Sequence, residues 1–488
     1  MSPLKVPVMV DAYASAVDLA KAIKAKEVSS LELVDMYIER IEQYDDEINA
    51  VVVRDFERGK AAATAADEAL AQGEDLGPLH GVPMTIKEAY DIEGLPTTWG
   101  VVEYKDNIAT TDADSVHRLK GAGAIFIGKT NVPHNLADFQ SFNDIYGTTN
   151  NPWDLTRTPG GSSGGSSAAL AAGLTGLEAG SDIGGSIRNP AHFCGIYGHK
   201  PTWGIVSDQG HALPGALAPA DIAVVGPMAR SAEDLALSMD IVSGAGRTDA
   251  RGWQLNLPRP QKTSLADFRV AILPNHAHAP VSPEMADRVQ TIGEVLARLG
   301  ATVSDSALPD IDFDQSFEIY SSLLWGVMAQ GMSEEEKDTY RTTQGSLGEG
   351  SIAADVARFS IQEHGEWLTY NNQRFHLRKA WDAFFRDWDI LICPQMATDA
   401  FPHDHGEYLG RTLTVGNEDQ DYMQQVFWSG TVTVAHLPST VFPTGLSNSG
   451  LPIGLQAVSA EYNDYVTIDF SRLMAREIGG FTPPPDFP

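Results

Sequence analysis

Residues 160–190 read GGSSGGSSAALAAGLTGLEAGSDIGGSIRNP, two short glycine- and serine-rich segments separated by an apolar run. Glycine lets the backbone bend sharply, so that several N–H groups can point to one place beside a serine. The two serines of interest are Ser162 and Ser186, 24 positions apart. Acyl transfer needs this combination of a hydroxyl on a tight turn and donors for the developing oxyanion. The stretch therefore predicts a hydrolase active site.

Two other interpretations of the first segment are available. A Gly/Ser tract can be a flexible linker, but here AALAAGL continues directly into apolar sequence. Residues 160–164 also match the G-x-S-x-G nucleophile elbow, which would make Ser162 the nucleophile of an α/β-hydrolase-like esterase. That arrangement needs an acid and a histidine later in the chain, and no single pair stands out there.

Further motifs surround the two serines. In chain order they are GPLHGVPMTIKEAYDIEGLPTTWG (77–100), GAIFIGKTNVPH, TNNPWD, GSDIGGSIRNPAHFCGIYGHKPTWG (180–204), VVGPMARSAEDLALSMDIVSG and SGLPIGLQ. With GGSSGG, this series resembles the amidase-signature serine hydrolases over most of the chain, most densely at 77–244. The resemblance implies a single amidase-signature domain over 1–488, with a variable region at about 249–430 that shapes the substrate site.

The resemblance also implies a role for individual residues. Ser186 falls where the family has its acyl-accepting nucleophile, and Ser162 where it has a bridging serine preceded by a cis peptide bond. Lys87 falls where the family has its base. The backbone N–H groups that match the oxyanion hole belong to Ile183, Gly184, Gly185 and Ser186. The residues expected to hold this loop in shape are Ser181, Asp182 and Arg188.

The chemistry of such a site follows from the residue types. A lysine has a reference pKa of about 10.4, and burial among apolar groups lowers it because the charged form is disfavoured. Val82, Met84 and Ile86 alternate before Lys87, which predicts a strand that leads this lysine into the interior. The expected relay passes a proton from Ser186 through Ser162 to neutral Lys87, and later to the leaving amine. Without the resemblance, a surface lysine at a strand end is the ordinary alternative.

The predicted activity is hydrolysis of a carbon–nitrogen amide bond through an acyl-enzyme, without metal or cofactor. The substrate expected is a small apolar or aromatic amide, anilide, ester or carbamate. Two segments, 316–332 and 422–430, can line its pocket, although they can equally be core helices. A third candidate wall is 134–153. The alternatives are a glutaminase subunit of an amidotransferase complex and a catalytically idle binding protein on the same scaffold.

Composition restricts the partners. The 488 residues are 43% hydrophobic and carry a net charge of −31, which argues against nucleic acid and against an anionic membrane surface. Two cysteines, Cys194 and Cys393, do not make a disulfide framework. No apolar run is long enough to span a bilayer and no signal peptide is evident, so a cytoplasmic enzyme is expected. The resemblance implies a homodimer.

Two other patterns are weaker. Residues 123–130, GAIFIGKT, match the Walker A pattern, but AIFI is typical of a buried strand rather than a phosphate-binding turn. His276 with His278, and His403 with His405, are two pairs of potential metal ligands about 125 residues apart. Without further ligand motifs they are better interpreted as loop histidines.

The fold expected is α/β, a mixed, mostly parallel central sheet covered by helices on both faces. Helices are predicted at 15–26, 31–44 and 56–72, with a Ser29–Glu32 capping box before the second. The strands predicted are VPMTI, AIFIG, IAVVG, RVAIL and DILIC. Three residues depart from the family pattern: Glu88, His192 and His199.

Overall fold

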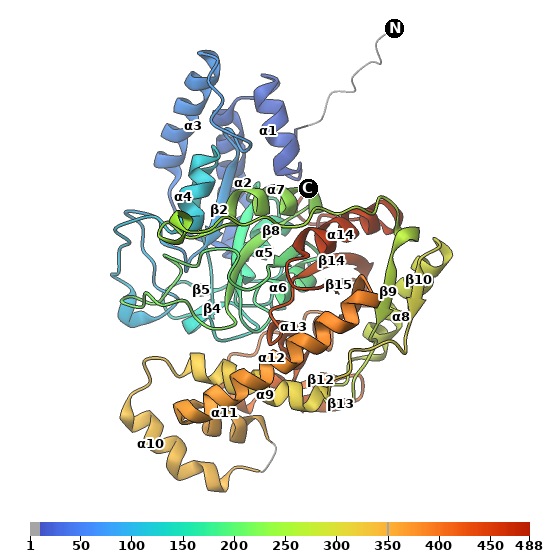
Figure 1. The fold of residues 1–488 in the computed structure, drawn as a ribbon. Helices are drawn as coiled ribbons and strands as arrows, with labels where there is room; N and C mark the ends of the chain where they lie inside the picture. Colours follow the sequence, from blue (N-terminus) through green and yellow to red (C-terminus); the bar gives the residue numbers. More distant parts are fainter. Residues whose placement is uncertain (1–9, 349–350) are drawn as a thin grey trace.

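The computed structural model describes residues 10–348 and 351–488, and an eight-stranded sheet forms the centre of the fold (Figure 1). The strands of this sheet are, in spatial order, β10 (Thr302–Ser304), β9 (Arg269–Ile272), β11 (Ile390–Pro394), β15 (Pro452–Val458), β14 (Ser439–Leu446), β7 (Tyr197–Lys200), β8 (Val224–Ala229) and β6 (Glu178–Asp182). The sheet is mixed and flanked by helices, which confirms the predicted α/β class.

The expected predominance of parallel pairs is wrong. In the described chain only β10–β9 and β9–β11 pair in parallel, and every other neighbouring pair of this sheet is antiparallel. The parallel pairs are joined through helices, whereas β14 and β15 are joined by a short turn that permits an antiparallel hairpin. Strands β6, β7, β14 and β15 were not predicted, because glycine or proline interrupts each of them.

A second, three-stranded sheet carries the predicted base. Its strands are, in spatial order, β1 (Val51–Arg54), β3 (Ile125–Thr130) and β2 (Pro83–Lys87). Two of the predicted strands, VPMTI and AIFIG, therefore belong to this small sheet and not to the central one. All residues of β2 are buried, so the chain leads Lys87 into the interior as the alternation indicates. Two small hairpins complete the strands: β4 (Phe142–Asn143) with β5 (Gly147–Thr148), and β12 (Thr412–Val415) with β13 (Glu418–Asp421).

Fourteen α-helices lie in the described part of the chain. They are α1 (Ala16–Lys24), α2 (Ser30–Ile48), α3 (Phe56–Ala71), α4 (Asp114–Gly121), α5 (Gly164–Ala171), α6 (Arg188–Cys194), α7 (Ala232–Val242), α8 (Pro283–Arg298), α9 (Phe313–Met328), α10 (Glu334–Thr343), α11 (Ile352–Ser360), α12 (His364–Asp387), α13 (Val426–Thr433) and α14 (Asp464–Ile478). The first three match the three predicted helices. The capping box is confirmed, because Ser29 Oγ accepts from Glu32 N while Glu32 Oε2 accepts from Ser29 N.

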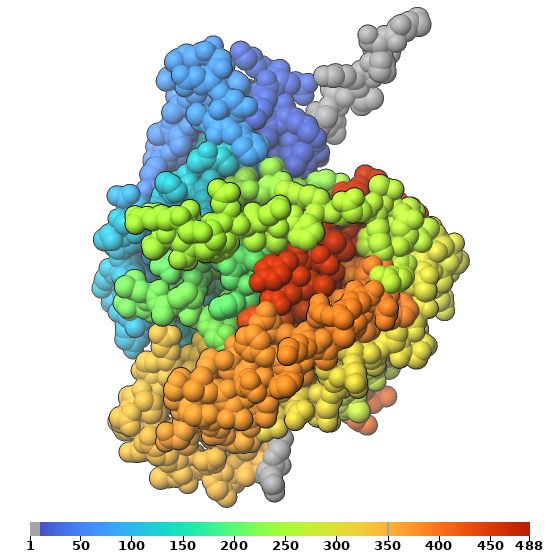
Figure 2. Space-filling view, in the orientation of Figure 1, coloured from blue at the N-terminus to red at the C-terminus, as the bar shows by residue number. Residues whose placement is uncertain are grey.

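The helices α10 and α11 lie at the opposite end of the molecule from α1 and α3 (Figures 1 and 2). Between these ends, α5 and α6 are buried along their whole length. Helix α5 has no solvent-facing polar side because protein surrounds it. This is the pattern expected of a core helix. No helix in the described residues combines the length and the hydropathy needed to cross a bilayer.

Candidate active site

Lys87 is the last residue of β2 and is completely buried. Its Nζ donates to Ser162 Oγ at 2.6 Å and to Ser181 Oγ at 2.9 Å. Among the described residues it forms no ion pair with a carboxylate. Burial lowers the pKa of Lys87 to about 7, although the negative charges of Asp182 and Glu178 oppose this shift. The lysine is therefore partly neutral at neutral pH and can accept a proton.

Ser162 lies in a bend immediately before α5, and the Gly161–Ser162 peptide bond is cis, as the resemblance implies. Gly161 N donates to Asn189 Oδ1 at 2.9 Å. A Cβ at Gly161 would collide with the carbonyl oxygens of Asp138 and Gln140, so only glycine fits there. No strand leads directly into this serine, and its hydroxyl contacts a lysine rather than a histidine. The nucleophile-elbow interpretation of Ser162 is therefore wrong.

Ser186 lies in the loop between β6 and α6 and is 7% exposed. The loop folds around Asp182, whose carboxylate accepts from Gly185 N at 2.9 Å and from Ile187 N at 3.1 Å. Gly185 has a φ of 110°, a conformation that favours glycine. A side chain there would also collide with Ser429 Oγ.

The four predicted oxyanion donors divide into two groups. The N–H of Gly185 is occupied by Asp182, so it stabilises the loop. Among the described residues, the N–H groups of Ile183, Gly184 and Ser186 have no hydrogen-bond acceptor. These three groups are available to a ligand, whereas the fourth is not.

Asp182 and Arg188 form a fully buried ion pair. Arg188 donates from Nη2 to Asp182 Oδ1 at 2.8 Å and from Nε to Oδ2 at 3.0 Å. Burial alone would raise the pKa of Asp182, but the charge and hydrogen bonds of Arg188 prevail and lower it to about 2. Arg188 also donates to Thr433 Oγ1 at 2.8 Å and to Gln456 Oε1 at 3.0 Å. The pair thus connects the Ser186 loop to α13 and β15.

Tyr320, on α9, is a part of the site that sequence reasoning missed. Its hydroxyl donates to the carbonyl oxygen of Ile183 at 3.0 Å, which fixes the peptide that begins the Ser186 loop. The apolar segment around Tyr320 gave no signal that separates a contact with the loop from ordinary core packing.

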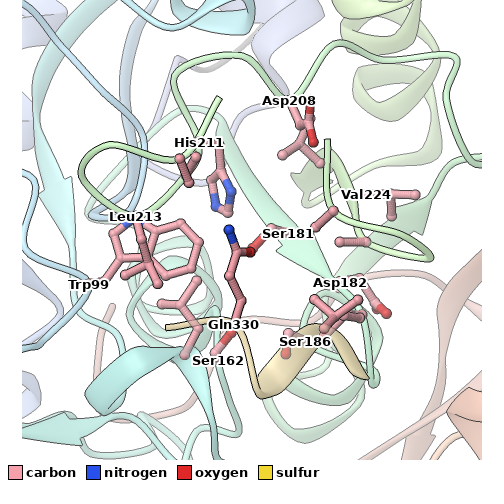
Figure 3. Close-up of a pocket in the computed structure, with 18 of the residues that line it drawn as sticks. Trp99, Ser162, Ser181, Asp182, Ser186, Asp208, His211, Leu213, Val224 and Gln330 are labelled. Carbon is pink, nitrogen blue, oxygen red and sulfur yellow. The ribbon is translucent and has the colours of Figure 1, made fainter. Parts of the chain in front are cut away.

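Ser186 lines two adjoining cavities. The larger one has a volume of about 130 Å³ and extends past Ser162 and Ser181 towards Trp99 and His211 (Figure 3). The smaller one, of about 50 Å³, extends in another direction and does not reach Ser162. Its walls include Leu324, Trp325, Tyr408, Met423 and Val426.

The three segments predicted as pocket walls contribute in part. Residues 134–153 and 316–332 supply Leu136 and Met328, which line both cavities, and 422–430 supplies Met423 and Val426. Other members of these segments, such as Phe317 and Trp428, are buried in the core. These segments therefore supply both pocket walls and core, through different side chains.

The departures from the family pattern have structural explanations. His192 accepts from Gly454 N at 2.7 Å, and its pKa is lowered to about 4 by burial. His199 contacts Thr440 Oγ1 at 2.9 Å and Asp464 Oδ1 at 3.1 Å, which connects β7 to β14 and α14. The carboxylate of Glu88 accepts hydrogen bonds from the backbone N–H groups of Thr98 at 2.6 Å and Trp99 at 2.9 Å.

The other patterns fall outside the site. Residues 125–130 are the buried strand β3, so the Walker A match is not a phosphate-binding turn. His276 and His278 stack on Phe427 with ring centroids 4.9 and 5.1 Å away, and His405 stacks on Phe142 at 4.0 Å. No cluster of three potential metal ligands occurs within residues 10–348 and 351–488. Both cysteines are buried and free.

Comparisons with known proteins agree with this geometry. The family model described as Amidase matches residues 32–468. The chain is 31% identical over 507 residues to fatty-acid amide hydrolase 2 of Homo sapiens, covering 97% of this chain and 90% of that protein. It is 32% identical over 486 residues to a glutamyl-tRNA(Gln) amidotransferase subunit of Anaeromyxobacter dehalogenans, covering 95% and 96%.

Among solved structures, a bacterial aryl acylamidase of the amidase signature family superimposes with a TM-score of 0.81 at 25% identity, covering 96% of each chain. The family model spans most of the sequence, and both relatives align over nearly their full length. The chain therefore belongs to the amidase-signature family.

Proposed function

We propose that this protein hydrolyses small amides through an acyl-enzyme on Ser186, with Ser162 and Lys87 as the proton relay. The observation that carries the proposal is the 2.6 Å contact between Lys87 Nζ and Ser162 Oγ, together with a Lys87 pKa lowered to about 7 by burial. A buried lysine without a carboxylate partner is suited to act as a base, because its neutral form is accessible at neutral pH.

The reaction begins when Ser186 Oγ attacks the substrate carbonyl carbon. Its proton passes to Ser162 while Ser162 gives its own proton to Lys87. The tetrahedral oxyanion is therefore formed together with a protonated Lys87. The free N–H groups of Ile183, Gly184 and Ser186 stabilise that oxyanion.

Collapse of the intermediate breaks the carbon–nitrogen bond. The proton returns from Lys87 through Ser162 to the leaving nitrogen, which departs as a neutral amine. Water then attacks the ester carbonyl on Ser186 and gives a proton through Ser162 to Lys87. That proton returns through Ser162 to Ser186 Oγ as the carbon–oxygen bond breaks and the carboxylic acid leaves. The overall reaction converts one amide and one water into one carboxylic acid and one amine. Every proton passes through Ser162 and Lys87.

The substrate class follows from the cavity walls. Apolar and aromatic side chains dominate both cavities, and a cavity of roughly 150 Å³ with apolar walls can accept a benzene ring. We therefore propose apolar or aromatic amides and anilides as substrates, with esters and carbamates as further candidates. The remaining expectations, a single domain, a cytoplasmic location, a homodimer and no cofactor, are retained as proposals.

The relationship to the amidotransferase protein favours one second candidate, a glutaminase that passes ammonia to a partner protein. Strict dependence on glutamine and copurification of a second protein would favour it. Turnover of simple anilides by the isolated chain would favour the amidase.

The experiment is covalent labelling with a fluorophosphonate, followed by peptide mapping. Label on Ser186 that is lost in Lys87→Ala and Ser162→Ala supports the proposal. Lys129→Ala is the matched control, because Lys129 is also a buried lysine with a pKa lowered by burial to about 8, yet it donates to Thr97 Oγ1. Label on another residue, or undiminished labelling of Ser186 in Lys87→Ala, would refute the relay.

A further inference from the structure

The position of Ser162 distinguishes the two cavities. Under the proposed function, the leaving nitrogen must receive its proton from Ser162, so the amine half of the substrate has to lie on the Ser162 side of Ser186. Ser162 and Ser181 line the larger cavity and neither lines the smaller one. The amine half therefore occupies the larger cavity, and the acyl half points towards the smaller one.

Two residues that line the larger cavity each carry an unpartnered polar atom. Trp99 Nε1 and His211 Nε2 are both buried and have no hydrogen-bond partner among the described residues. Both side chains line the cavity, and their rings are adjacent, with centroids 5.2 Å apart. In Figure 3 they lie on the opposite side of the cavity from Asp182 and Ser186. Buried polar groups are normally paired, so two neighbouring exceptions in one cavity indicate a place for ligand atoms.

The surrounding structure holds these two rings in place. Trp99 has a φ of 56°, an uncommon conformation for a tryptophan, and Glu88 Oε2 accepts from its N–H at 2.9 Å. His211 packs edge-on against Tyr90, with centroids 4.7 Å apart. Residues with such uncommon backbone conformations cluster at active sites and ligand-binding segments.

The charges near the pair restrict its ligand. Burial and the nearby Lys87 lower the pKa of His211 to about 3, so its ring is neutral at physiological pH. Trp99 Nε1 can only donate, which requires an acceptor on the ligand. Asp208 also lines the cavity and disfavours an anionic ligand.

We propose that Trp99 and His211 form a recognition site for an uncharged hydrogen-bonding oxygen, such as that of a ketone or carboxamide, on the amine half of the substrate. The inference deepens the proposed function and rests on it for the assignment of the amine half. It selects anilides with a carbonyl substituent over anilides of the same shape without one.

The test measures binding by calorimetry in a Ser186→Ala background, where no turnover occurs. The ligands are acetanilides with an acetyl or an isopropyl substituent, which have similar shapes, at the para and the meta position. The acetyl compound of at least one pair should bind about tenfold tighter, the effect of one ordinary hydrogen bond. Adding Trp99→Phe or His211→Phe should abolish that preference and leave the affinity for the isopropyl compound unchanged.

Two further variants control for loss of fold. His211→Gln keeps an amide near the position of Nε2 and should retain part of the preference. His436→Phe should leave it unchanged, because His436 also has a buried unpartnered Nε2 beside a tryptophan but does not line the cavity.

Equal affinity within every pair, no binding of either compound, or a preference that survives both phenylalanine substitutions would overturn the inference. Failure of the proposed function would be seen separately, as absent labelling of Ser186 in the wild-type protein.

Discussion

The pH dependence of Ser186 reactivity tests the central element of the mechanism, a lysine whose pKa lies at about 7. Burial lowers the pKa of Lys87 from 10.5 to about 7, a change of about 5 kcal/mol in the relative free energies of its two protonation states. Only the neutral form can take the proton from Ser162. The reactivity of Ser186 should therefore follow the neutral fraction of Lys87.

The magnitude follows from that fraction. With a pKa of about 7, the neutral fraction rises about tenfold between about pH 6 and about pH 8, and then reaches a plateau. An ordinary lysine would give a rise of about a hundredfold over the same interval and no plateau below about pH 10. The two cases therefore differ in both slope and shape.

The assay is the second-order rate constant for inactivation by a fluorophosphonate, measured across this range in buffers of constant ionic strength. Glu178→Gln serves as a companion variant. Burial raises the pKa of Glu178 to about 8, so this carboxyl is neutral well below that pH. In that range the pH profiles of the inactivation rate should coincide for the wild-type protein and Glu178→Gln. A rate that keeps rising tenfold per unit through about pH 9, or a rate without pH dependence, would refute the assignment of Lys87.

Two substitutions test stability. Lys87→Met should abolish Ser186 labelling and raise the free energy of unfolding at pH 7 by about 2 kcal/mol, because the loss of a costly buried amine outweighs two lost hydrogen bonds. The wild-type protein should recover this difference in stability as pH rises from 7 towards 10.5, since the unfolded lysine then binds more protons than the folded one. Denaturant melts at several pH values check the difference at pH 7 and its pH dependence. A wild-type protein as stable as Lys87→Met at pH 7 would contradict the expected cost of the buried amine. Asp182→Asn should cost about 3–5 kcal/mol, because it leaves Arg188 buried without its counter-charge. Thermal melts of Asp182→Asn against Asp154→Asn, whose carboxylate pairs with Arg157 at the surface, separate this effect from ordinary charge loss.

Much of the site could be predicted because its residues are close in sequence. The loop from Ser181 to Arg188 folds around Asp182, so a single motif specifies the nucleophile, the donors and their support. The alternation before Lys87 also predicted its burial. Local patterns such as the Ser29–Glu32 capping box were confirmed for the same reason.

The remaining parts depend on contacts between distant segments. Tyr320 is more than 130 positions from Ile183, whose carbonyl it contacts, and periodicity cannot separate it from its core neighbours. The direction of pairing in the central sheet was missed because strands such as β15 contain glycine and proline. The engagement of Gly185 N–H by Asp182 needs the folded loop, since the motif presents all four N–H groups alike.

The partners of the two buried carboxylates near Lys87 explain how the lysine stays partly neutral in a strongly acidic protein. Either carboxylate could form an ion pair with it and raise its pKa. Asp182 is ionised but bound by Arg188, and Glu178 is held by Thr85 Oγ1 at 2.5 Å with a pKa raised to about 8 by burial. One negative charge is thus compensated and the other is mostly removed by protonation at neutral pH, which limits how far they oppose the lowered pKa of Lys87. Lys87 is left with two hydroxyl partners, and only one of them, Ser162, lies next in the proposed path to Ser186.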